Sequence, residues 1–339
     1  MTDKPLITVR DLSVHFPIGG AVFTKQKYIK AVNKVSIEIA PGTFFGLVGE
    51  SGSGKTTLGR ALLKAVPITE GHVHYNDNGT HYDLNNISAS ELKEYRKRCQ
   101  LIFQDPYSAL SPRMTVRDII AEPLEVMKLT SSRKETDERV RAIAERCRLS
   151  LEHLRRYPHA FSGGQRQRIS IARALVCHPR FLVADECVAA LDVSIQADIL
   201  NLLKSFQEEM GLTFLFISHD LSVVAHTCDK VAVMYLGQIV EIAETKKLFF
   251  NTRHPYTKAL LSAIPSLDPD ETHTAIKLEG EIPSPTNPPS GCKFHTRCAF
   301  VQDRCRSEEP ELLAKDGDHL VACHFADELM GENGNAGAS

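Results

Sequence analysis

The run of eight residues from Gly49 to Thr56 constrains this chain more than any other segment. Its sequence, Gly-Glu-Ser-Gly-Ser-Gly-Lys-Thr, has the spacing G-x-x-x-x-G-K-[ST] and lies between a strand-like stretch, 42–48, and a helix-like stretch, 57–63. Glycines let backbone N–H groups turn inward, and the start of the following helix adds positive potential, so such a loop encloses phosphate groups. The order strand, loop, helix predicts an α/β fold that binds a nucleoside triphosphate.

Each residue of this loop has an expected part in the site. Lys55 is expected to reach the β- and γ-phosphates, and Thr56 to hold Mg²⁺ through its hydroxyl. The other loop residues expected at the nucleotide are Gly49, Glu50, Ser51, Gly52, Ser53, Gly54 and Thr57. A glycine-rich turn without a ligand is the alternative, and the flanking strand and helix patterns count against it.

An apolar segment that ends in two acids, 181–186, predicts the other half of the site. Phe-Leu-Val-Ala is typical of a buried parallel strand, and Asp185 and Glu186 follow it. We expect Asp185 beside the metal and Glu186 as the general base that polarises the attacking water. Acids at this place can instead cap the turn after the strand, an interpretation that weakens when the chain also carries a phosphate loop.

Composition limits the partners of the protein. The 339 residues carry a net charge of −2, with a pI near 6.7, so the overall charge does not favour nucleic acid. No stretch approaches the ~20 apolar residues of a membrane-spanning helix, and residues 1–10 contain no hydrophobic targeting segment. We expect a soluble, cytoplasmic protein whose role at any membrane depends on a partner.

The segment 161–168, Phe-Ser-Gly-Gly-Gln-Arg-Gln-Arg, resembles the signature motif of ATP-binding-cassette (ABC) ATPases. Four other positions are similar to further motifs of that family: Gln104 to the Q-loop, Asp192 to the D-loop, His219 to the switch histidine, and Phe16 to the aromatic that stacks on adenine. The resemblance implies a P-loop NTPase cassette at 1–250, with a RecA-like core, an antiparallel β subdomain and a helical subdomain at about 108–168. Core packing remains the alternative for Phe16.

The resemblance also implies how the site works. Two cassettes dock head to tail, so each ATP lies between the phosphate loop of one and the signature of the other. The signature residues implied at that nucleotide are Ser162, Gly163, Gly164 and Gln165. Gln104 would contact the Mg²⁺ or the attacking water, and His219 would assist catalysis.

The composition of the chain changes near residue 250, after which the sequence becomes proline-rich. Its sequences at 253–261, 280–285 and 287–292 resemble the C-terminal extension of ATP-binding subunits of dipeptide and oligopeptide importers, most of all the F-type subunit. That resemblance implies an extension at 251–325, before a tail at 326–339 that we expect to be disordered. It further implies a second, different ATPase subunit, two membrane-spanning permease subunits, an extracytoplasmic peptide-binding protein, and a peripheral location on the cytoplasmic face of the inner membrane.

Four of the nine cysteines crowd into the last fifth of the chain. Cys292, Cys298, Cys305 and Cys323 are separated by gaps of five, six and seventeen residues, wider than is usual in zinc fingers. Four thiolates can hold zinc or an iron–sulfur cluster, and free thiols are a third alternative. The family resemblance implies a [4Fe-4S] cluster. His295 and His324 lie close enough in sequence to compete as ligands.

One departure from the family pattern is Cys187, which stands where a proline usually follows the catalytic glutamate. An exposed thiol at this place would make activity sensitive to oxidation, whereas a buried one would be a small packing residue.

Two other functions of cassette ATPases fit the layout of the chain less well. Those that act on ribosomes resemble twin cassettes with a cluster in front, whereas here one cassette precedes the cysteines. DNA-repair ATPases need a long coiled-coil insertion, yet Lys55 and Ser162 are 107 residues apart (162 minus 55) without sustained heptads.

Overall fold

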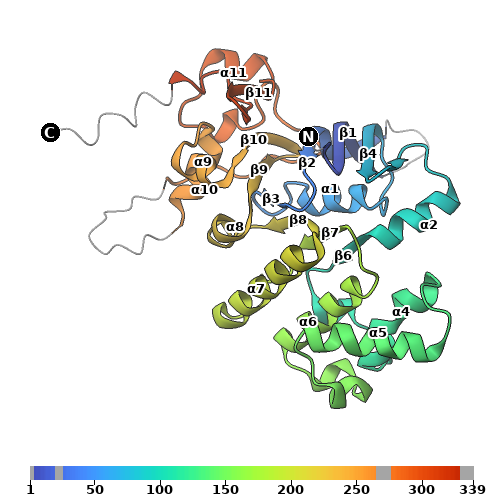
Figure 1. The fold of residues 1–339 in the computed structure, drawn as a ribbon. Helices are drawn as coiled ribbons and strands as arrows, with labels where there is room; N and C mark the ends of the chain where they lie inside the picture. The colour runs from blue at the N-terminus through green and yellow to red at the C-terminus, as the bar shows by residue number, and fades with distance from the viewer. Residues whose placement is uncertain (1–3, 20–25, 265–275, 329–339) are drawn as a thin grey trace. The chain divides into compact units, whose positions relative to one another are not determined.

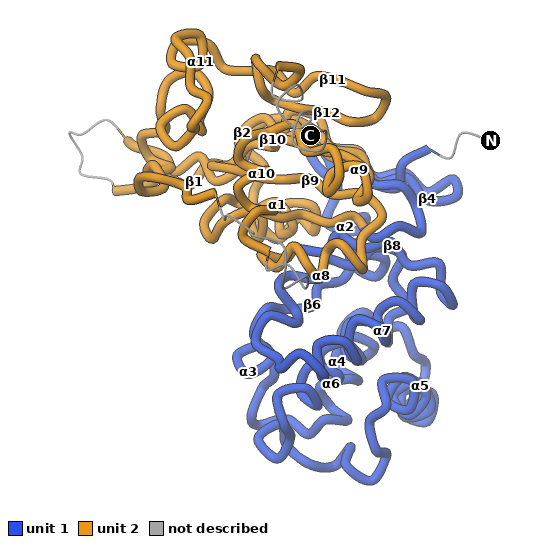
Figure 2. Tube along the Cα trace, turned by 90° about the vertical axis from the view of Figure 1, so that its left-hand side faces the viewer, with its two compact units in different colours: residues 1–7, 39–44, 74–217 blue, residues 8–38, 45–73, 218–339 orange. Residues whose placement is uncertain are grey.

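The computed structural model describes residues 4–19, 26–264 and 276–328 (Figure 1). Most of the tail expected to be disordered, 329–339, lies outside the described residues. The chain forms two compact units, each drawn from several stretches of sequence (Figure 2). Unit 1 takes residues 1–7, 39–44 and 74–217, and unit 2 takes residues 8–38, 45–73 and 218–339.

Unit 1 contains a group of three parallel strands with β7 in the middle. They are β6 (Cys99–Ile102), β7 (Phe181–Asp185) and β8 (Thr213–Ser218). Val183 of β7 pairs with Leu101 on one side and Leu215 on the other. Every residue of β7 and β8 is buried, and for β7 this confirms the buried strand that the apolar run 181–184 predicts.

Helices make up much of the rest of unit 1. They are α2 (Ala89–Arg98), α3 (Pro106–Ala109), α4 (Val116–Val126), α5 (Arg133–Arg146), α6 (Gly163–Leu175) and α7 (Val193–Met210), with 3₁₀ turns η1 (Leu151–Arg155) and η2 (Pro158–Ala160). Charged and apolar residues at helical spacing predict helices at 90–98, 133–148 and 194–210, and the structure confirms them as α2, α5 and α7. Their N-cap side chains, Ser88, Ser132 and Asp192, each accept a hydrogen bond from an N–H of the first turn.

Unit 2 places the phosphate loop at the end of a buried strand. β3 (Phe44–Val48) runs parallel to β9 (Lys230–Tyr235), and β9 pairs antiparallel with β10 (Gln238–Glu244). Helix α1 (Lys55–Leu62) follows β3 after the loop, as the strand–loop–helix pattern predicted. The shorter helices of this unit are α8 (Leu221–Thr227), α9 (Thr245–Phe250), α10 (Pro255–Ser262) and α11 (Asp303–Ser307), with the 3₁₀ turn η3 (His295–Arg297).

The remaining strands lie at the N-terminal side of the chain. β1 (Ile7–Ile18) has β2 (Lys27–Ile39) and β4 (Glu70–Asp77) as its neighbours in an antiparallel sheet. β4 also forms a hairpin with β5 (Thr80–Asp83), in which His74 lies opposite Asp83.

Residues after 250 are joined to the rest of unit 2 by strand pairing. β12 (His319–Val321) pairs with β10, and β11 (Leu313–Asp316) pairs with β12, which extends the sheet past β10. The proline-rich stretch 283–289 forms neither helix nor strand, because proline lacks the N–H that both need. The domain boundary near 250 stays a prediction. Within the described ranges, no helix combines the length and the apolar character that crossing a bilayer requires.

Candidate functional site

The phosphate loop has a backbone that only glycine can adopt at two of its positions. Gly49 and Gly54 have φ values of 148° and 107°, in the region that other residues avoid. A Cβ atom at Gly49 would collide with the Met234 carbonyl oxygen, and one at Gly54 with that of Ala31. The two glycines therefore let the loop pass close to neighbouring backbone and bring it directly into the start of α1.

Lys55 lies across the loop. The residue is 4% exposed, and its Nζ donates hydrogen bonds to the carbonyl oxygens of Gly49 (2.8 Å) and Glu50 (2.9 Å). Thr56 and Thr57 line a hollow of about 160 Å³ together with Gly52, Gly54 and Lys55. An ammonium group beside this hollow, at the positive end of a helix, is the arrangement that binds an anion.

Glu50 is held from three sides by unit 2. Its backbone N–H donates to Tyr256 Oη (2.9 Å), its carbonyl accepts from Lys55, and its carboxylate accepts two hydrogen bonds from Arg297. The Arg297 bonds run from Nη1 to Oε2 (2.7 Å) and from Nη2 to Oε1 (3.0 Å). Bonding to Glu50 raises the pKa of Arg297 further above its usual range. The contacts of Glu50 with Tyr256 and Arg297 span 206 and 247 positions, and no local sequence signal points to them.

Glu186, which directly follows β7, lies beside the Q-loop glutamine. Gln104 Nε2 donates to Glu186 Oε2 at 2.8 Å, so unit 1 brings these two predicted residues together. Asp185 is buried at the end of β7. Glu186 has a φ of 45°, a strained conformation that its N–H stabilises by donating to the Ile217 carbonyl oxygen at 3.0 Å.

The signature segment begins α6 with a reciprocal cap. The Ser162 N–H donates to Gln165 Oε1 (3.0 Å), and Ser162 Oγ accepts from the Gln165 N–H (3.4 Å). A Cβ at Gly164 would lie 2.5 Å from Cγ2 of Ile195, so glycine allows α6 to pack closely against α7. Gly163 has no such restriction, because its nearest neighbour would be 3.8 Å away.

Three other predicted site residues lie at or near the ends of helices and strands. Asp192 accepts from the Ile195 N–H (3.0 Å) and from Ser194 Oγ (2.7 Å), and these bonds lower the pKa of its carboxyl. His219 is exposed between β8 and α8, and Phe16 is half-buried near the end of β1. The roles of these three residues toward a nucleotide remain predictions.

The four C-terminal cysteines come together around one cavity of about 20 Å³. Cys292, Cys298, Cys305 and Cys323 all line it, together with aromatic and histidine side chains that include His295 and His324. Burial raises the pKa of Cys292 to about 11 and that of Cys323 to about 12. Without a metal these two thiols hold their protons at neutral pH, which suits buried ligands that release protons on binding.

The spacing of these sulfurs bears on which metal they fit. Among the described residues, one group of three or more potential ligands has all of its ligand atoms within 4.8 Å of one another, and this group contains no cysteine. No three of the four sulfurs are therefore that close together. A tetrahedral zinc site with bonds of about 2.3 Å needs sulfurs about 3.8 Å apart. The sulfurs in this structure are therefore farther apart than a zinc ion bound by three or four of them requires.

The remaining cysteines are packing residues. Cys187 is 2% exposed, and burial raises its pKa to about 12, so the thiol beside Glu186 is shielded from oxidants. Of its two expected forms, the structure shows the small buried residue. Burial likewise raises the pKa of the other four thiols, Cys99, Cys147, Cys177 and Cys228.

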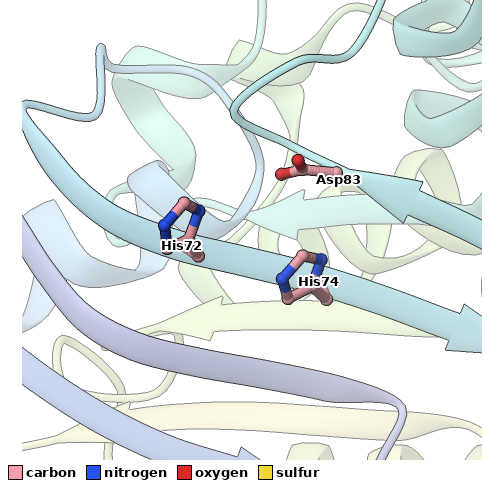
Figure 3. Close-up of side chains that lie close together, drawn as sticks. All are labelled: His72, His74 and Asp83. Atoms are coloured by element: carbon pink, nitrogen blue, oxygen red, sulfur yellow. The ribbon is translucent and has the colours of Figure 1, made fainter.

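The group of potential ligands that does lie within 4.8 Å is on the β4–β5 hairpin: His72, His74 and Asp83 (Figure 3). Both oxygens of Asp83 already accept hydrogen bonds, from the Asn85 N–H and from Asn86 Nδ2. The pattern His-x-His in a strand could have pointed to this group in the sequence.

Comparison with known proteins gives two family matches and several relatives. A family described as "ABC transporter" matches residues 32–189, and one described as "Oligopeptide/dipeptide transporter, C-terminal region" matches residues 240–305. The oligopeptide transport ATP-binding protein OppF of Haemophilus influenzae is 47% identical over 323 residues, 94% of this chain and 96% of the relative. The di/tripeptide transport ATP-binding protein DppF of Pseudomonas aeruginosa is 44% identical over 328 residues, 97% of this chain and 100% of the relative.

A solved structure shares the fold of the cassette. It is the dimeric ATP-binding cassette MJ0796 in a post-hydrolysis state, bound to ADP and Pi. The similarity has a TM-score of 0.62 and 27% sequence identity, and it covers 70% of this chain and 98% of the other.

Proposed function

The chain belongs to the family of ABC-transporter ATP-binding subunits that power peptide import, and from this premise we propose how its residues bind and cleave ATP. The observation that carries the proposal is the phosphate loop, with Lys55 buried beneath it and a hollow beside it. The enzyme is an ATPase coupled to transport.

ATP binding rests on the loop and on the start of α1. Backbone N–H groups between Gly49 and Thr57 surround the phosphates, and Lys55 exchanges its two carbonyl partners for phosphate oxygens. Thr56, Asp185 and Gln104 would hold Mg²⁺, which would supply positive charge that neutralises the phosphates. The half-buried Phe16 stacks on the adenine ring.

Hydrolysis rests on Glu186 as the general base for the attacking water. Its hydrogen bond from Gln104 supports this role, because a glutamine that touches the base is placed to sense the nucleotide and to orient water. His219 assists at the γ-phosphate.

The assembled form is a head-to-tail dimer of cassettes. Ser162, Gly163, Gly164 and Gln165 start a helix, and the N–H groups there suit the γ-phosphate of an ATP held by the other cassette. Asp192 lies in the same interface. The second cassette is a different subunit, and the pair works with two permease subunits and an extracytoplasmic peptide-binding protein, at the cytoplasmic face of the inner membrane. ATP binding closes the dimer and hydrolysis opens it.

In this proposal the four cysteines of the extension would hold a [4Fe-4S] cluster. The cavity that all four cysteines line supports a shared site, and a cluster is the occupant that the family resemblance implies. When bound, the cluster ties together segments that have little apolar core of their own.

The substitution Glu186→Gln tests the catalytic part. It keeps the shape of the side chain and removes the base, so MgATP binding and ATP-dependent dimer formation should persist while kcat falls by about 10²–10⁴-fold. Glu208→Gln, on the exposed face of α7, serves as the matched control and should leave kcat unchanged. Undiminished hydrolysis by Glu186→Gln would remove Glu186 from this role.

A further inference from the structure

Arg297 of the cysteine-rich segment is bonded to the second residue of the phosphate loop. The bidentate pair with Glu50 is well shielded, since the Arg297 side chain is 6% exposed and that of Glu50 is 25% exposed. A planar guanidinium that meets a carboxylate with two hydrogen bonds fixes both distance and orientation, which a lysine would not do.

Aromatic rings surround this pair and reinforce it. Tyr235, Tyr256 and Phe294 pack against one another with centroid distances of 4.7 to 5.3 Å, and the Arg297 guanidinium lies 6.0 Å from the Tyr235 ring. Tyr256 also accepts the hydrogen bond from the Glu50 N–H. The extension therefore holds both the backbone and the side chain of Glu50.

A carboxylate inside an anion-binding loop opposes phosphate binding unless its charge is compensated and its direction controlled. Arg297 does both, because the fork neutralises Glu50 and turns its oxygens toward the extension. The Glu50 carbonyl is at the same time one of the two acceptors of Lys55. Movement of Glu50 would thus disturb the residue expected to bind the phosphates.

We propose that Arg297 is a positioning residue for the nucleotide site, and that through its ion pair with Glu50 the C-terminal extension sets the ATP affinity of the phosphate loop. The inference rests on the proposed role of that loop. A preformed loop binds more tightly because less of the binding free energy is spent on ordering it.

The test compares variants of the full-length protein by their dissociation constants for MgATP, measured by titration calorimetry. Arg297→Ala should weaken binding by about fivefold or more, a typical size for coupling between sites. Glu50→Gln combined with Arg297→Ala should bind no more weakly than Arg297→Ala alone, because the pair acts as one unit. Arg297→Lys, which keeps the charge and loses the fork, should lie between Arg297→Ala and the wild type.

Arg304→Ala is the matched control. Arg304 also precedes a cysteine of the extension and pairs with a glutamate, Glu308, at 2.6 Å, but this pair is exposed. Arg304→Ala should leave the affinity for MgATP within twofold of the wild type. If Arg297→Ala also stays within twofold, or weakens binding no more than Arg304→Ala, the proposal is wrong.

Two further readouts keep the outcomes separate. A thermal melt of each variant shows whether it folds, and a folded Arg297→Lys suffices for the test if Arg297→Ala does not fold. Failure of the wild-type protein to bind MgATP would overturn the proposed function of the loop itself, whereas wild-type binding with unaffected variants overturns only the role of Arg297.

Discussion

Lys55 is the residue of the phosphate loop whose charged side chain is expected to bind the phosphates. Hydrogen bonds to two carbonyl oxygens hold the ammonium group beneath the loop, from where it can donate to a bound triphosphate instead. Because hydrogen bonds to charged groups contribute about 1.5–3 kcal/mol, Lys55→Ala should weaken MgATP binding by about tenfold or more. Fluorescence titration with a nucleotide analogue would measure this, and Lys93→Ala, an exposed lysine of α2, should bind as the wild type does.

His254 makes the stability of the protein depend on pH. Burial lowers its pKa from 6.5 to about 4, and its Nδ1 accepts the Tyr256 N–H as the N-cap of α10, which requires the neutral ring. The folded pKa lies below the unfolded one, so the unfolded chain binds more protons between these values. Stability is therefore full above about pH 6.5 and falls as the pH drops towards 4, by up to about 3 kcal/mol.

Urea unfolding at pH 7.5 and pH 5 would test this dependence. His254→Asn removes the titrating ring, so its free energy of unfolding should change less between the two pH values than that of the wild type. His226→Asn, at an exposed position of α8, should keep the wild-type dependence. Equal pH dependence in all three proteins would contradict the role given to His254.

At the scale of elements, the contact between α6 and α7 depends on a single glycine. A methyl group at Gly164 would press on the β-branched Ile195, which has little freedom to move aside. Gly164→Ala should therefore lower the free energy of unfolding by about 1–3 kcal/mol, the usual cost of overpacking.

Gly163→Ala is the comparison for this substitution. It lies one position earlier in the same helix, where the nearest atom to an added Cβ is 3.8 Å away, and it should be close to neutral. Equilibrium unfolding followed by circular dichroism measures both. A Gly164→Ala protein as stable as Gly163→Ala would show that α7 shifts without cost.

At the scale of the whole molecule, the metal group proposed at the cysteine site is expected to stabilise the fold of the extension. Iron and acid-labile sulfide analysis of anaerobically purified protein should give about four of each per chain. Removing the metal with a chelator should make residues 276–328 more susceptible to limited proteolysis, and this increase should be larger than the increase for residues 26–264. The reason is that the cluster links segments with few apolar contacts. Zinc without iron would overturn the cluster assignment.

Local patterns in the sequence were enough to predict much of this protein. The phosphate loop and the strand that ends at Asp185 each depend on neighbours in the chain: glycine's freedom at positive φ in the loop, and a continuous apolar run in the strand. Such features appear in the order of residues before any long-range contact forms.

Contacts between distant residues were decided only by the tertiary structure. The pairing of Gln104 with Glu186 spans 82 positions, and that of Arg297 with Glu50 spans 247. Whether the thiol of Cys187 is buried depended likewise on packing around it. Charge and hydrogen-bonding capacity are properties of a residue, but its partner is chosen by the folding of the whole chain, and for that reason the link between the extension and the phosphate loop could not be predicted from the sequence.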